Sequence, residues 1–109
     1  MGYHEWKKCI DACLECASVC NHCASECAKE EDVKMMAKCI QLDMECSTLC
    51  YNAAQLMSLG SDLAKQVCAI CAEICRLCGE ECGKHQTEHC RECSRICLAC
   101  AAECRKMAA

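Results

Sequence analysis

The chain has 109 residues, a net charge of -4 and an apolar content of 54%, which favours one globular domain over residues 1–109. Its acidic balance, with no block of Lys or Arg, excludes typical nucleic-acid binding and attraction to an anionic membrane surface. Cysteine accounts for 19 residues, so the chain is either a disulfide scaffold or a metal-rich protein.

The first eight residues, MGYHEWKK, lack the apolar segment of a secretory signal, and no uncharged stretch is long enough to span a bilayer. We therefore expect a cytoplasmic protein without a membrane partner. In a reducing cytosol the cysteines are expected to be thiols or metal ligands, and their odd number also argues against a disulfide scaffold.

Helices are the expected elements, because the chain has no Pro and only four Gly. Apolar periodicity predicts four of them, over residues 3–29, 33–58, 62–82 and 87–107. Short connections favour antiparallel neighbours, so the fold class is all-α, an up-down-up-down four-helix bundle.

Residues at the predicted boundaries support this division. Gly60 and Gly83 are expected to end the second and third helices in the left-handed conformation. Cap residues stand before the second, third and fourth helices, namely Asp32, Ser61 or Asp62, and Thr87.

The cysteines recur with alternating spacings of four and three, which places them on one face of each helix and defines a seam. The second seam is sparser, and Met36, Asp43, Ala53 and Met57 fill its other positions. The seam cysteines are Cys9, Cys13, Cys16, Cys20, Cys23 and Cys27 in the first helix, Cys39, Cys46 and Cys50 in the second, Cys68, Cys71, Cys75, Cys78 and Cys82 in the third, and Cys90, Cys93, Cys97, Cys100 and Cys104 in the fourth.

Four inward-facing seams would form a tube lined by thiols, sealed by apolar residues beside each seam. Cysteine is a small hydrophobe when protonated, and it must supply much of the core because Leu, Ile and Val together number only sixteen. The sealing residues are Ile10, Val19, Ile40, Leu42, Leu49, Leu56, Val67, Ile74 and Ile96.

Thiolates select soft metals such as Cu(I), Zn(II) and iron-sulfur clusters. A structural zinc site closes a tetrahedron of four ligands, whereas all six Cys-x-x-Cys pairs here lie within continuous helical seams. Nineteen buried thiolates would also repel one another strongly, and about one monovalent cation per thiolate would cancel that charge. The pattern therefore favours multiple Cu(I) ions per chain.

The whole chain from Cys9 to Cys104 resembles the cytosolic copper storage proteins, through its four seams and the run CGEECGKH at residues 78–85, followed by His89 and Cys90. The resemblance implies a four-helix bundle, often a homotetramer, that stores Cu(I) for sequestration, detoxification or supply to copper enzymes. It also implies that every seam cysteine is a metal ligand, and that copper donors and acceptors are partners.

Antiparallel order gives the tube two chemically different ends. One collects Cys27, Met36, Cys82, His85 and Cys90, and the other collects Trp6, Met57, Ala64 and Met107. We expect Cu(I) to enter beside His85, an exchangeable loop ligand, and include His85 among the metal ligands. For His89 the structural and ligand interpretations stay equally open, and Met36, Met57 and Met107 are expected to be core filler.

Asp43 interrupts a sulfur seam, and a buried carboxylate is costly without a partner. We expect it to hydrogen-bond to a thiol, to Tyr51 or to a helix terminus rather than to bind metal. Five outward apolar residues favour an oligomer interface. They are Leu14, Met44, Ile70, Leu77 and Leu98.

Other functions fit less well. A zinc or cadmium buffer with the role of metallothionein is the main alternative. An iron-sulfur carrier needs four cysteines around one cluster, and a thiol oxidoreductase needs a βαβ context that the sequence lacks. No Ser-His-Asp set, phosphate loop or carboxylate pair can be assigned to one site, so we expect storage without catalysis.

Overall fold

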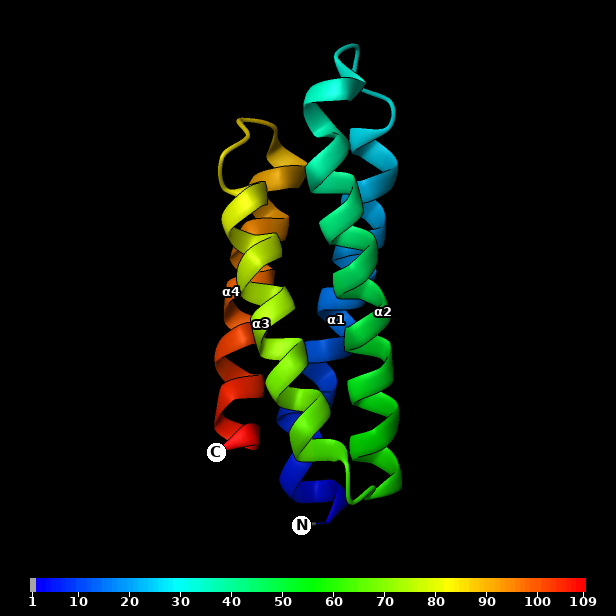
Figure 1. Cartoon of the computed structure of the whole chain (residues 1–109), viewed down its shortest axis with the longest axis vertical. Coiled ribbons are helices and arrows are strands. Elements are labelled where there is room, and N and C mark those ends of the chain that lie inside the picture. The colour runs from blue at the N-terminus through cyan, green and yellow to red at the C-terminus, as the bar shows by residue number, and fades with distance from the viewer. Residues whose placement is uncertain (1) are drawn as a thin grey trace.

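The computed structural model describes residues 2–109, which form four long helices in an antiparallel bundle (Figure 1). The helices are α1 (Tyr3–Cys27), α2 (Ala37–Leu59), α3 (Ala64–Cys82) and α4 (Glu88–Ala108). A single 3₁₀ turn, η1 (Val33–Met36), precedes α2. The all-α, up-down-up-down fold predicted from the sequence is confirmed.

Each helix packs against its two neighbours in the ring α1, α2, α3, α4, and the molecule measures 46 × 18 × 18 Å. The α1–η1 turn and the α3–α4 connection lie at the same end of the bundle, which we call the loop end (Figure 1). Both chain termini and the α2–α3 connection lie at the opposite end, which we call the terminal end. No helix within residues 2–109 has the length and apolar character needed to cross a membrane.

The helix boundaries follow the sequence prediction closely, with one change of helix type. Residues Val33–Met36 form a 3₁₀ turn rather than the first turn of α2, and the Asp32 side chain makes no cap hydrogen bond. The tighter turn brings Met36 into the core with 5% exposure. This arrangement reverses the chain direction over a few residues after α1.

The two interhelical glycines differ from each other. Gly60 is left-handed (φ 68°), and a pair of hydrogen bonds from Gly60 N to Met57 O and from Ser61 N to Leu56 O closes α2. The prediction that Gly83 would also be left-handed is wrong, because its φ is -64°. A Cβ at Gly83 would lie 3.1 Å from Ser94 Oγ, so this glycine instead allows α3 and α4 to approach closely.

Small side chains fill the interior. All 19 cysteines are at most 1% exposed, and alanines such as Ala17, Ala53 and Ala101 lie beside them. Of the predicted sealing residues, Ile10, Ile74 and Ile96 are buried, and the others are partly buried against the core. The helices therefore enclose a core made mainly of sulfur and methyl groups, as the seams predict.

Candidate metal centre

The four seams bring their cysteine side chains into one shared interior, and every cysteine is a free thiol. This arrangement follows from the four-three spacing, because residues at that spacing share one helix face and each such face is turned toward the bundle axis. The sulfurs are linked across helix boundaries at hydrogen-bonding distances. Both the positions of the cysteines on the helices and their burial therefore agree with the predicted thiol tube.

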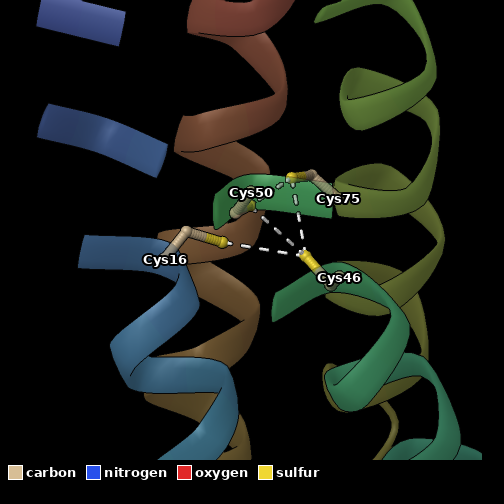
Figure 2. A group of neighbouring side chains, drawn as sticks. All are labelled: Cys16, Cys46, Cys50 and Cys75. Atoms are coloured by element: carbon tan, nitrogen blue, oxygen red, sulfur yellow. Dashed lines mark hydrogen bonds between the residues drawn. The ribbon is translucent and has the colours of Figure 1, made fainter. Parts of the chain in front are cut away.

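The middle of the bundle shows how the sulfurs converge (Figure 2). Cys46 of α2 lies 3.8 Å from Cys16 of α1 and 3.6 Å from Cys75 of α3, measured between Sγ atoms. Cys50, one turn further along α2, lies 3.6 Å from the same Cys75 sulfur. Three helices thus contribute to one group of four thiols whose sulfurs all lie within 4.8 Å of one another.

Neighbouring groups of this kind share members along the bundle. Cys16 and Cys46 also belong to a group with Cys20 and Cys97, which reaches α4. Cys20 and Cys97 recur in the next group, together with Cys78 and Cys93. A sulfur that belongs to two groups can bridge two metal ions, so the geometry suits a chain of linked clusters rather than separate sites.

The carboxyl group of Asp43 lies inside the tube, where cysteine thiols from three helices surround it. Its Oδ1 accepts hydrogen bonds from Cys78, Cys93 and Cys82 at 3.1, 3.2 and 3.4 Å, and Cys39 donates to Oδ2 at 3.8 Å. The predicted thiol partnership is confirmed. Tyr51, one of the alternative partners, is 47% exposed.

The carboxyl of Asp43 is completely buried. Burial, together with negative charge on the nearby sulfurs of Cys93 and Cys78, raises the pKa of Asp43 to about 11. The group is therefore a neutral acid at neutral pH. Asp43 nevertheless falls into a four-member group with Cys23, Cys39 and Cys82 that has metal-binding spacing.

Burial also raises the pKa of the Cys27 and Cys90 thiols at the loop end. A thiolate in this interior would lose its hydration without gaining a cation, so the protonated form is favoured. In the metal-free bundle these thiols are consequently neutral and contribute to the core as small apolar groups.

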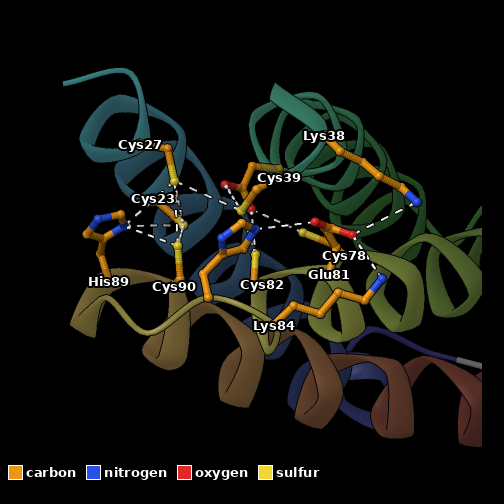
Figure 3. A network of polar contacts seen from close by, with 12 residues as sticks. Cys23, Cys27, Lys38, Cys39, Cys78, Glu81, Cys82, Lys84, His89 and Cys90 are labelled. Atoms are coloured by element: carbon orange, nitrogen blue, oxygen red, sulfur yellow. Dashed lines mark hydrogen bonds and ion pairs between the residues drawn. The ribbon is translucent and has the colours of Figure 1, made fainter. Parts of the chain in front are cut away.

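At the loop end, a histidine ring joins the thiols (Figure 3). His89 Nδ1 lies 3.6 Å from Cys90 Sγ, 3.7 Å from Cys23 Sγ and 3.8 Å from Cys27 Sγ. The His89 side chain is 13% exposed, and its Nε2 lies 3.0 Å from Glu30 Oε1. His89 therefore lies between solvent and the outermost thiols. The sequence signal for this position is that His89 directly precedes a seam cysteine, Cys90.

His85 lies differently. Its Nε2 is 3.3 Å from Glu81 Oε2, and among residues 2–109 its ring makes no hydrogen bond to a thiol. Glu81 also forms ion pairs with Lys84 and Lys38, at 3.3 and 3.9 Å (Figure 3). The structure thus brings His89, rather than the predicted His85, into contact with the cysteines.

The terminal end is more apolar. Trp6 is 4% exposed and Met57 is fully buried, which agrees with the prediction that Met57 fills the core. Cys104 Sγ lies 3.7 Å from Cys9 Sγ and 3.6 Å from Cys13 Sγ, so the thiol array continues to this end. The two ends of the bundle therefore differ chemically, as the sequence predicts.

Comparisons with known proteins agree with this geometry. A family model described as Csp, copper storage protein, matches residues 3–109. The cysteine-rich protein YhjQ of Bacillus subtilis (strain 168), described as uncharacterized, is 46% identical over 101 residues, which cover 93% of this chain and 94% of the relative.

Two solved structures extend the likeness to three dimensions. Copper storage protein 3 of Bacillus subtilis, in its Cu(I)-bound form, matches with a TM-score of 0.92 and 44% identity over 95% of this chain and 98% of its own. A cytosolic copper storage protein of Streptomyces lividans, described with five coppers, matches with a TM-score of 0.93 and 36% identity over 97% and 93%. This chain belongs to the copper storage protein family.

Proposed function

We propose that this protein stores multiple Cu(I) ions in its interior through the core cysteine thiolates. The observation that carries the proposal is the sharing of sulfurs between adjacent four-thiol groups, for example Cys16 and Cys46 in two groups at once. Shared thiolates can bridge ions, which lets one helix bundle hold a row of linked metal sites. The family relationship supports copper as the cargo.

The proposed ligands are the 19 seam cysteines from Cys9 to Cys104, all of which are buried. His89 is well placed to assist at the loop end, because its Nδ1 faces three thiols. His85 remains a proposed ligand as well. To bind Cu(I), however, its ring must first leave Glu81.

Uptake is an exchange of protons for copper. Neutral thiols line the metal-free tube, and each bound Cu(I) replaces thiol protons while keeping the interior near electrical neutrality. Loading without proton release would place positive charge in a water-poor core, and deprotonation without metal would place negative charge there. Both are costly, so the two events are coupled.

The zinc or cadmium buffer is the alternative that the sulfur spacing alone leaves open. With zinc-sulfur bonds of about 2.3 Å, a tetrahedral site has sulfurs about 3.8 Å apart, close to the separations seen here. Such a zinc site is complete with four thiolate ligands, and few of those ligands are shared with a neighbouring site. The overlapping groups and the family of this chain favour Cu(I).

Anaerobic titration of the reduced protein with Cu(I), followed by metal counting after gel filtration, tests the proposal. We expect capacity to rise to many ions per chain, and to survive competition with a Cu(I) chelator. A parallel Zn(II) titration should saturate at a much lower ratio. Uptake of a single cuprous ion, or equal capacity for zinc, would overturn the proposal.

We further propose a cytoplasmic homotetramer that sequesters copper without catalytic turnover and exchanges it with copper donors and acceptors. The cytosolic copper storage protein from Streptomyces lividans supports the location. The predicted outward residues Leu14, Met44, Ile70, Leu77 and Leu98 are each at least 39% exposed, which supports an interface. Light scattering of the wild type, compared with Ile70→Glu, tests the assembly.

A further inference from the structure

Glu30 and His89 form a contact at the loop end, between the turn after α1 and the start of α4. Glu30 lies in the turn after α1, and its Oε1 is 3.0 Å from Nε2 of His89 in the first turn of α4. The carboxylate side chain is 38% exposed, whereas the imidazole is 13% exposed. The ring is therefore held largely out of water, with its solvent side occupied by a carboxylate.

The chemistry of this contact fixes the proton on the ring. A carboxylate only accepts hydrogen bonds, and a neutral imidazole has one N–H donor and one lone pair. The contact with Glu30 therefore requires the N–H at Nε2, which leaves the lone pair on Nδ1. Nδ1 is the atom that faces the sulfurs of Cys90, Cys23 and Cys27, at 3.6 to 3.8 Å.

We propose that Glu30 is a positioning residue for copper uptake: it holds His89 as the Nε2–H tautomer, with the Nδ1 lone pair directed at the three outermost thiols. The inference rests on the proposed storage function and names a residue outside the thiol array. Carboxylates that accept the free N–H of a ligating histidine act in this way in many metal sites.

The second histidine–carboxylate pair at this end does not offer the same arrangement. Glu81 is shared among His85, Lys84 and Lys38, so its charge is already partly neutralised. Among residues 2–109, Glu30 has His89 as its sole ion-pair partner. Only the Glu30 pair combines an unshared carboxylate with a ring nitrogen that faces thiols.

The test compares Glu30→Gln with Glu26→Gln in the full-length reduced protein. Glu26 makes the matched control, because it lines the same surface groove as His89 and loses the same charge, but its hydrogen bond is to Lys29. Long-range ¹⁵N–¹H NMR of the metal-free protein reports the His89 tautomer. Stopped-flow mixing with Cu(I) then gives the initial uptake rate, and titration gives the final capacity.

We expect a single Nε2–H tautomer in the wild type and in Glu26→Gln. In Glu30→Gln, an amide that can both donate and accept should let both tautomers populate, with an initial uptake about tenfold slower and an unchanged capacity. Glu30→Asp should keep the tautomer and recover part of the rate. A wild-type Nδ1–H tautomer, or identical tautomers and rates in Glu30→Gln and Glu26→Gln, would overturn the inference.

The NMR measurement needs no copper, so it separates this inference from the proposed function. If no variant takes up Cu(I), storage is refuted, and the tautomer in the wild type and Glu30→Gln still decides the role of Glu30. Because Glu30 is partly exposed in a turn, its substitution should leave the helical circular dichroism unchanged.

Discussion

Cys93 Sγ of α4 lies 3.2 Å from Asp43 Oδ1 of α2, so a thiol and a carboxyl group share a hydrogen bond at a level of the core closed to water. Two further thiols, from Cys78 and Cys82 of α3, donate to the same oxygen. Three helices are thus tied to one acid. The state of that acid affects both folding and metal uptake.

Asp43→Asn should change how the stability of the metal-free protein depends on pH. The pKa of Asp43 is raised from 3.8 to about 11, so between those values the folded chain keeps a proton that the unfolded chain releases. The free energy of unfolding of the wild type should therefore fall as pH rises from about 5 to about 8. Because Asn cannot ionise, the Asp43→Asn variant should lack the part of this fall that is due to Asp43. Urea unfolding at several pH values measures it.

The exposed Asp62 provides the control for that experiment. Asp62→Asn should follow the wild-type pH profile. Equal slopes for the wild type and Asp43→Asn would show that the carboxyl is ionised in the folded state as it is in the unfolded state.

Removing a shared thiol should reduce storage more than removing a terminal one. Cys46 contacts the sulfurs of Cys16, Cys50 and Cys75, and it belongs to two four-thiol groups. Cys68 lies near the terminal end, where its neighbouring thiols are those of Cys9 and Cys71. We expect a larger fall in Cu(I) capacity for Cys46→Ala than for Cys68→Ala, as counted by metal analysis.

Equal losses from the two cysteine variants would indicate separate sites with one dominant thiol each. Circular dichroism of the reduced variants should confirm that both remain helical, because Cys→Ala keeps a small apolar side chain in the core.

His89→Ala should slow Cu(I) uptake more than His85→Ala. The Nδ1 atom of His89 already faces three thiols, whereas His85 is bound to Glu81. Stopped-flow mixing with a Cu(I) complex would measure the initial rates, while the final capacity should change little in either variant. A greater effect at His85 would place metal uptake beside Glu81 rather than beside Cys23, Cys27 and Cys90.

Copper loading should release protons and should reverse in acid. Burial raises the pKa of the Cys27 and Cys90 thiols, so they are protonated at neutral pH before metal binds. Calorimetric titrations in buffers of different ionisation enthalpy should report about one proton per thiolate formed. Heats that do not depend on the buffer would mean that the thiols are already ionised in the metal-free protein.

Gly60→Ala should destabilise the metal-free bundle by about 1 kcal/mol, because a side chain in the left-handed conformation is strained. The backbone at Gly60 has a φ of 68° and closes α2 through two hydrogen bonds. Gly60→Asn should cost less, since Asn adopts this conformation more readily. Urea unfolding measures both, and an alanine variant as stable as the wild type would contradict the strain argument.

The sequence predicted the four helices and the inward direction of every cysteine, because periodicity along a single helix determines which face a residue occupies. It also predicted a thiol partner for Asp43. The identity of those partners, Cys78, Cys82 and Cys93, depends on the axial alignment of three helices. The residue pattern of a single helix cannot predict how the helices are aligned along the bundle axis.

The sequence did not separate the roles of the two loop-end histidines for the same reason. Both His85 and His89 lie near the predicted loop, but only the fold brings His89 beside Cys23 and Cys27 of α1. The error at Gly83 has a related cause. A side chain at Gly83 would crowd Ser94 on the next helix, and this contact, not the backbone angles of Gly83, explains the glycine.

The groups that fill the interior of this bundle are the same groups that receive the cargo. In many globular proteins, a core residue beside a cavity can be exchanged for a larger one to raise thermal stability while the functional surface stays intact. Here each such exchange would delete a donor atom. A more stable metal-free protein and a larger metal capacity therefore make opposite demands on the same side chains, and bound metal would add to the stability of the folded bundle.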